Sequence, residues 1–69
     1  MRELLEKLIE EMVDKGILYD EAQREFERRF IARALLRSNG NLSRAAEILG
    51  IHRNTLSRKV AAYRLARHA

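Results

Sequence analysis

The sequence contains no cysteine, no proline and only three glycines. The absence of cysteine excludes disulfides and thiolate metal sites. The two histidines, His52 and His68, are too far apart along the chain to suggest a local metal clip, so we expect no metal and no cofactor. Because proline and glycine are the residues that most disfavour helix interiors, their scarcity favours an all-α fold.

Long apolar runs are also missing. No stretch is long enough to cross a membrane, and the N-terminal segment MRELLEKLIEEM carries charge throughout, so no signal peptide is visible. These absences predict a cytoplasmic protein without a membrane partner.

The chain is short. Its 69 residues are expected to form one domain, 1–69. A core of this size rarely stabilises a fold by more than about 3–5 kcal/mol on its own. Since disulfides are excluded, we expect oligomerisation to supply the remaining stability of the fold. Well-packed long helices are the alternative source.

Charge is divided unevenly along the chain. Residues 1–30 carry six basic and nine acidic side chains, whereas residues 31–69 carry eight basic side chains and one acidic, which gives net charges of −3 and +7. Small soluble proteins are often basic. A basic excess confined to one half nevertheless favours a polyanion such as nucleic acid as the partner.

The segment from Asn41 to Val60, NLSRAAEILGIHRNTLSRKV, is typical of two short helices joined by a tight turn. Gly50 follows the first helix where a left-handed residue is favoured, and Ile51 is expected to fill the corner between the helices. We therefore predict a helix-turn-helix over residues 41–66. Its apolar faces comprise Ala45, Ala46, Ile48 and Leu49 on the first helix and Leu56 and Val60 on the second.

Two longer helices are predicted before this unit. Residues 2–15 repeat apolar side chains at helical spacing up to Gly16, and residues 21–38 carry a second stripe. Asp20 is the expected N-cap of the second helix, and Asn39-Gly40 is its expected C-cap. Asn41 is the expected N-cap of the next, short helix at Leu42–Leu49. The connector residues Ile17, Leu18 and Tyr19 are expected to tuck under the chain.

The N-terminal stripe has two interpretations. It is either a core within one chain or a surface that also packs against a second copy, and the lack of other support favours the second copy. Residues 1–38 are thus assigned to dimerisation. The expected interface comprises Leu4, Leu8, Met12, Phe26 and Phe30.

The final helix is predicted from Arg53 to about Ala66. At about 3.6 residues per turn, Leu56, Val60 and Tyr63 share its buried face. Its other face is polar and basic with small side chains, and such a face is usually just solvated. As the second helix of a helix-turn-helix in a basic half, however, it favours contact with nucleic acid. The face comprises Asn54, Ser57, Arg58 and Ala61.

The stretch GNLSRAAEILGIHRNTLSRKV resembles the Fis family of bacterial DNA-binding proteins, and together with EFERRFIARALLRSNGN it also resembles the C-terminal DNA-binding domain of NtrC-type enhancer-binding activators. The resemblance covers about residues 20–65. The positions that match are Gly40, Asn41, Arg44, Ala45, Ala46, Leu49, Gly50, Ile51, Arg53, Thr55, Leu56 and Lys59.

This resemblance implies a four-helix protomer whose first two helices intertwine with a partner to form a homodimer. The last helix of each protomer would enter the major groove of double-stranded DNA, and the DNA would bend. The implied role is transcription regulation or nucleoid organisation. RNA polymerase or a regulatory domain is a further partner to consider. The first helix begins almost at Met1, so we expect the N-terminal β-hairpin arm of Fis, and its action on a recombinase, to be absent.

The resemblance also assigns DNA contacts. Arg53 is the expected base-reading residue, since arginine commonly contacts guanine. His52 stands where Fis has an Asn that contacts bases or clashes with them, and Ser57 stands where Fis has a basic residue. Asn54 belongs to the outer face, and Lys59 is expected near flanking phosphates. The backbone-contacting positions are Asn41, Ser43, Arg44, Thr55 and Arg58.

Two other classes of function remain to be weighed. A protein-interaction module would use the same dimer without binding DNA, but it should expose apolar residues on the last helix, where Asn54, Ser57 and Arg58 stand. An enzyme is disfavoured, because no base is positioned beside a nucleophile and the chain is too short to enclose a site. The sequence leaves open whether the chain is a complete protein or the terminal domain of a larger activator.

Overall fold

The computed structural model describes residues 1–65, which form four helices and no strand. Helix α1 spans Arg2–Asp14, α2 spans Tyr19–Arg37, α3 spans Leu42–Leu49 and α4 spans Arg53–Tyr63. The all-α fold predicted from composition is therefore confirmed. None of these helices combines the length and apolar character that crossing a membrane requires.

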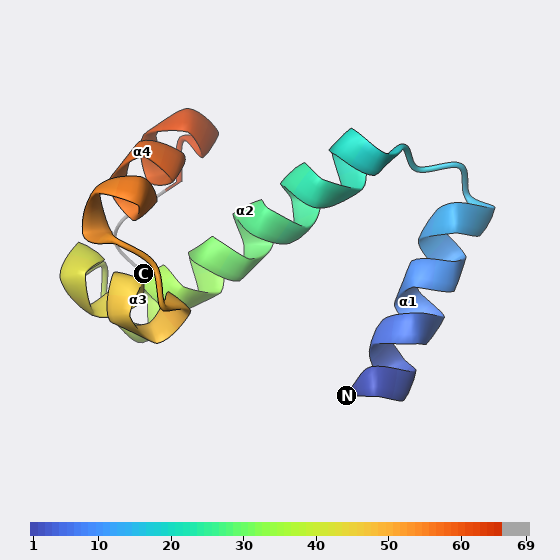
Figure 1. Cartoon of the computed structure of the whole chain (residues 1–69), viewed down its shortest axis with the longest axis horizontal. Helices are drawn as coiled ribbons and strands as arrows, with labels where there is room; N and C mark the ends of the chain where they lie inside the picture. Colours follow the sequence, from blue (N-terminus) through green and yellow to red (C-terminus); the bar gives the residue numbers. More distant parts are fainter. Residues whose placement is uncertain (66–69) are drawn as a thin grey trace.

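The core lies at one end of the molecule, where the C-terminal half of α2 meets α3 and α4 (Figure 1). Ala45 and Ala46 are 0% and 4% exposed, and their small side chains let α3 approach its neighbours closely. Leu35 from α2 and Leu56 from α4 are the largest fully buried side chains. The complete core comprises Ile31, Ala34, Leu35, Leu42, Ala45, Ala46, Leu56 and Val60.

Helix α1 stands apart from this core as an arm beyond the N-terminal end of α2 (Figure 1). None of its residues is buried. Leu4, Leu8 and Val13 are 72%, 55% and 69% exposed, and the apolar stripe that the sequence predicts is present but uncovered in the single chain.

All four helices end in the same hydrogen-bonded motif. The residue after the last turn adopts a left-handed conformation, and the N–H that follows it donates to a carbonyl five residues back. The predicted caps at Gly16, Asn39 and Gly50 are confirmed, with φ of 75°, 55° and 70°. The last helix differs from the prediction, since it ends at Tyr63 with Arg64 at φ 54° rather than continuing to Ala66.

This early end has a packing cause. Leu65 packs partly buried against the core, and its N–H donates to the carbonyl of Val60 at 3.0 Å. Ala66 itself lies outside the described residues.

The connector between α1 and α2 also differs from the prediction. Leu18 and Tyr19 are 68% and 78% exposed and do not tuck under the chain, and Ile17 is 39% exposed. Helix α2 begins at Tyr19, so Asp20 lies within its first turn rather than at the N-cap. The cause is a local hydrogen bond. The Glu21 carboxylate accepts from the Leu18 N–H at 3.2 Å, which makes Leu18 the N-cap residue of α2.

On α3 the apolar face is rotated from the predicted one. Ile48 is 51% exposed, whereas Leu42 is buried with Ala45 and Ala46. Ile51, expected to fill the corner of the turn, is 36% exposed. These shifts follow from α3 packing on α2 as well as on α4, a contact that periodicity within α3 does not reveal.

Candidate nucleic-acid interface

The unit formed by α3, its turn and α4 is held by local hydrogen bonds at each end. The Asn41 side chain accepts from the Arg44 N–H at 3.0 Å and caps α3, as predicted. Gly50 then adopts φ 70°, a conformation that costs a residue with a Cβ about 1–2 kcal/mol. The Ile51 N–H donates to the Ala46 carbonyl at 3.1 Å, which fixes the direction in which the chain enters α4.

His52 caps the start of α4. Its Nδ1 accepts from the Asn54 N–H at 3.1 Å. An imidazole that accepts at Nδ1 carries its proton at Nε2, so the ring presents an N–H donor. The sequence placed His52 at this helix start without predicting that its side chain is the cap.

Helix α4 has one buried and one open face. Leu56 and Val60 are 0% and 6% exposed and anchor the helix to the core. Thr55 and Tyr63 are half-buried at the edges of that face. The outer face is open, as predicted, and it comprises Asn54, Ser57, Arg58 and Ala61.

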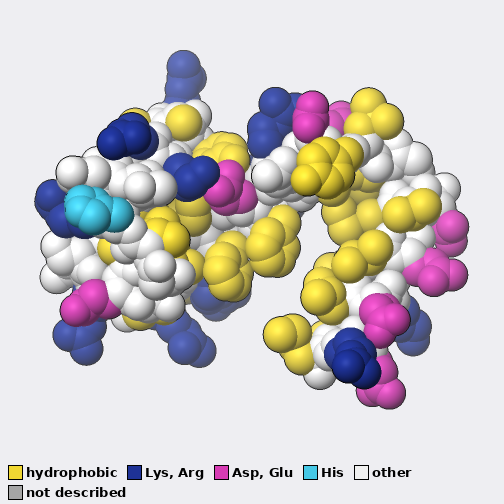
Figure 2. Space-filling model, viewed as in Figure 1, with side chains coloured by type: hydrophobic (Ala, Val, Ile, Leu, Met, Phe, Trp, Pro, Cys, Tyr) yellow, Lys and Arg dark blue, Asp and Glu magenta, His cyan; other side chains and the backbone are white. Residues whose placement is uncertain are grey.

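Three arginines of α3 and α4 are free of ion pairs within the described part of the chain. Within residues 1–65 the basic side chains of the ion pairs are Lys15, Arg28, Arg29 and Lys59. Arg44, Arg53 and Arg58 are exposed, and none of them has a carboxylate partner in that part of the chain. Figure 2 shows basic side chains and the histidine around the end that carries α3 and α4, and acidic side chains along α1.

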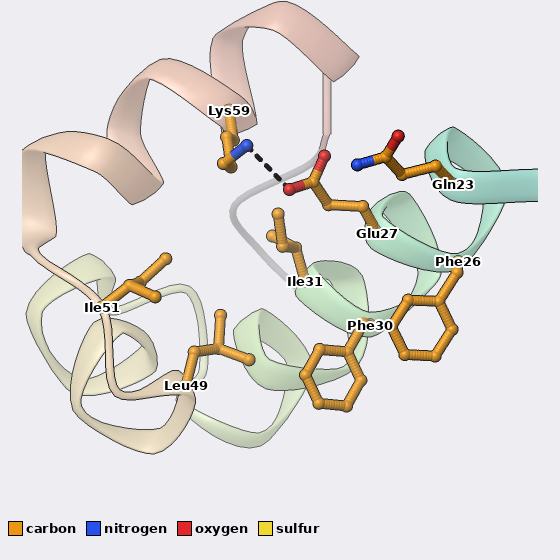
Figure 3. Close-up of a pocket in the computed structure, with 8 residues that line it drawn as sticks. All are labelled: Gln23, Phe26, Glu27, Phe30, Ile31, Leu49, Ile51 and Lys59. Carbon is orange, nitrogen blue, oxygen red and sulfur yellow. Dashed lines mark ion pairs between the residues drawn. The ribbon is translucent and has the colours of Figure 1, made fainter. Parts of the chain in front are cut away.

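Lys59 is placed differently from these arginines. Its Nζ lies 2.7 Å from Oε2 of Glu27 on α2 (Figure 3), so its charge is directed toward α2. The other oxygen of Glu27, Oε1, accepts from the hydroxyl of Tyr63. The expected contact of Lys59 with flanking phosphates would require this ion pair to open.

The three groups shift one another's pKa. The hydrogen bond from Lys59, followed by that from Tyr63, lowers the pKa of Glu27 below its ordinary value of 4.5. The same contacts raise the pKa of Lys59 and that of Tyr63, in each case chiefly through the hydrogen bond to Glu27. The carboxylate and the ammonium are therefore both charged across the neutral range.

Sequence reasoning did not identify Glu27. The only available signal was Tyr63 on the buried face of the last helix, a phenol that needs a polar partner. Nothing in the sequence places that partner on α2, since Glu27 and Tyr63 are 36 residues apart.

The residues predicted for the dimer interface lie on two elements that form one groove. Leu8 and Met12 of α1 face Phe26 and Phe30 of α2 across a hollow of about 610 Å³. Figure 2 shows apolar side chains gathered along this hollow. The two phenylalanine rings stack at 5.2 Å between centroids and are 59% and 55% exposed, and Leu4 lies further along α1.

The chain resembles known bacterial regulators over its C-terminal two thirds. The sequence pattern of the family described as "Bacterial regulatory protein, Fis family" matches residues 22–63, more than half of the chain. The match begins in α2 and ends with α4, so it includes Glu27, Lys59 and Tyr63 as well as the helix-turn-helix.

Two relatives match significantly. The DNA-binding transcriptional regulator NtrC of Azospirillum brasilense is 46% identical over 43 residues, which is 62% of this chain and 9% of that protein. A protein of Xylella fastidiosa (strain Temecula1) that bears the name Fis-like DNA-binding protein is 44% identical over 52 residues, which is 75% of this chain and 58% of that protein. The chain thus spans less than two thirds of each relative. No solved structure gives a significant match.

Proposed function

This chain belongs to the Fis family of bacterial regulatory proteins, and from that membership and the geometry of α4 we propose that it is a dimeric DNA-binding protein. Helix α4 of each protomer lies in the major groove, with Arg53 at its leading end reading a base. Arg44 and Arg58 contact phosphates, and Asn41 and Ser43 sit at the start of α3, whose N-terminus favours an anion. Thr55 contacts the DNA backbone, and the remaining groove-facing residues are His52, Asn54 and Ser57.

One observation carries this proposal. The outer face of α4 is polar and basic while Leu56 and Val60 on its inner face are buried, and Arg53 and Arg58 have no carboxylate partner within residues 1–65. A polar outer face is common to surface helices, so the proposal depends on this face belonging to the second helix of a Fis-family helix-turn-helix. A protein-docking helix would expose large apolar side chains there.

The proposed dimer is supported by exposed area. The chain exposes 5980 Å², whereas a compact monomer of 8.1 kDa would expose about 4500 Å². The excess, about 1500 Å², exceeds the roughly 800 Å² per partner that a stable interface covers. In addition, a helix of 13 residues with no buried side chain is marginal in water, so α1 needs a surface that the single chain does not provide.

A second copy of the chain fits that surface chemically. The apolar stripe of α1 matches the apolar hollow between α1 and α2, and the hollow is flanked by Arg29 and Arg33. Glu25 also lines the hollow and pairs with Arg29, so Arg33 is the lining arginine without a carboxylate partner in residues 1–65. Helix α1 carries five acidic and two basic side chains, so the α1 of a partner would bring complementary charge to Arg33. The intertwined arrangement implied by the family resemblance joins the two copies through these helices.

DNA bending and the biological role belong to the same proposal. If the two recognition helices lie closer than one turn of DNA, about 34 Å, both can enter the groove only when the duplex bends. Such a dimer would act in transcription regulation or nucleoid organisation inside the bacterial cytoplasm. If the chain is part of a longer activator like the NtrC relative, its partners would include the regulatory part of that protein.

The proposal is tested by binding a fluorescent duplex of about 25 base pairs at two salt concentrations, with the particle mass measured by light scattering in the same buffers. A dimer that makes about 6–10 phosphate contacts should lose roughly 10³–10⁵ in affinity between 50 and 200 mM salt. Arg58→Ala should weaken binding and reduce this salt dependence. Lys7→Ala is its matched control, because it removes one exposed positive charge on α1, far from α4 of the same chain (Figure 1). A dimer that binds no DNA even at low salt would instead support a protein-interaction module.

A further inference from the structure

The contact between α2 and α4 is unusual within this molecule. The other side-chain hydrogen bonds and ion pairs among residues 1–65 join residues two to four apart on the same helix or turn. Glu27 is the exception, because each of its carboxylate oxygens holds a different residue of α4. Figure 3 shows its side chain reaching from α2 toward Lys59.

This contact links α4 directly to α2 through side chains. Helix α2 packs on α3, and α3 packs on α4. Leu56 and Val60 hold the buried face of α4 by close packing, but neither forms a directional side-chain bond to α2. The two bonds from Glu27 are directional, and they act one helical turn apart, at Lys59 and Tyr63.

We propose that Glu27 is a positioning residue for α4: its carboxylate holds Lys59 and Tyr63 and so fixes the angle between the recognition helix and the dimerisation helix. This inference rests on the proposed function and deepens it. Because α2 belongs to the proposed dimer core, the same contact sets how far apart and at what angle the two recognition helices of the dimer stand.

The contact also controls which cations reach DNA. The Glu27 carboxylate neutralises Lys59 and keeps it off the phosphates, while Arg44, Arg53 and Arg58 stay free. Removing the carboxylate would therefore do two things at once. It would loosen the angle of α4, and it would release one lysine per chain for sequence-independent contact.

The first test measures geometry without DNA. The chain has no cysteine, so Ala32→Cys on α2 and Ser57→Cys on α4, both at exposed positions, give two unique attachment sites for spin labels. Labelled chain is mixed with excess unlabelled chain, so that pulsed electron resonance reports only distances within one protomer. We expect a broader distance distribution in Glu27→Gln than in the wild type.

Glu25→Gln is the matched control. It removes the same charge from the same helix, but within the described residues 1–65 the Glu25 carboxylate pairs with Arg28 and Arg29 of α2 itself. Its distribution should equal that of the wild type. Equal distributions in all three proteins, each shown to be folded by circular dichroism, would overturn the positioning role.

The second test measures DNA readout. A duplex selected by the wild-type chain from a random library is compared with a scrambled duplex of the same composition. In Glu27→Gln the ratio of the two dissociation constants should fall about fivefold or more, the lower end of what one mismatched base pair costs. The slope of log affinity against log salt should steepen by about 1.8, since each released lysine adds roughly 0.9 and the dimer has two.

A charge exchange separates positioning from direct DNA contact by Lys59. Lys59→Glu alone should reduce the ratio, and adding Glu27→Lys should restore most of it by remaking the ion pair in the opposite sense. If Lys59 instead binds phosphate, the double variant stays as defective as the single one and the inference fails. A wild-type chain that binds neither duplex at low salt refutes the proposed function. In that case the distance measurement, which needs no DNA, still tests whether Glu27 positions α4.

Discussion

Phe30 offers a sharp test of the dimer, because its side chain is 55% exposed in the single chain. An aromatic side chain can bury about 150–250 Å², so roughly 80–140 Å² of Phe30 remains for a partner to cover. At about 25 cal/mol per Å² this amounts to about 2–3.5 kcal/mol per chain, or about 4–7 kcal/mol for the two copies. Phe30→Ala should therefore raise the dimer dissociation constant by about 10³–10⁵.

The assay is sedimentation equilibrium over a wide range of protein concentration, with the helical content followed in parallel. Because α1 has no buried residue in the single chain, dissociation should also reduce its helicity. Ile48→Ala is the control, since Ile48 is 51% exposed but lies on α3, at the other end of the molecule from the groove. If Phe30→Ala changes dimerisation no more than Ile48→Ala does, the groove between α1 and α2 is not the interface.

The remaining predictions concern the recognition unit and its support. Arg53→Ala should weaken binding to the selected duplex by about 1–3 kcal/mol and flatten sequence preference, and equal weakening on a scrambled duplex would exclude base reading. Gly50→Ala should lower stability by about 1–2 kcal/mol in urea denaturation; an added Cβ meets nothing within 4 Å, so the cost arises from the backbone at φ 70° alone. Arg64→Gly should raise stability by up to about 1 kcal/mol, because φ there is 54°, and an unchanged melting temperature would show that the left-handed turn is not strained. The contribution of Glu27, measured as the wild type minus Glu27→Gln, should be present above pH 4.5 and be lost as pH falls through the lowered pKa of that carboxyl. At the alkaline end the contribution should decline above about pH 10, since the raised pKa values of Tyr63 and Lys59 stabilise the fold only while those groups hold their protons. A difference that stays constant from pH 3 to 11 would contradict this account.

Much of the local structure could be predicted from the sequence. Helix α3 has the bounds expected from its pattern, and the cap at Asn41 and the left-handed turn at Gly50 follow from the chemistry of two residues. The opposite faces of α4 follow from helical period, with Leu56 inside and Arg58 outside. These features depend on interactions within about four residues, which a sequence displays directly.

Tertiary structure decided the features that depend on distant partners. Periodicity shows that Leu8 and Phe30 each lie on the apolar face of their own helix. It does not show that the single chain leaves both side chains exposed. It places Lys59 beside the buried face of α4 without showing that Glu27 holds it there. Helix α4 ends at Tyr63 because Leu65 turns back to the core. The segment contains no proline or glycine from which this end could be predicted. A sequence determines which residues share a face, because that is local geometry; what covers each face is determined only when segments far apart in the chain pack together.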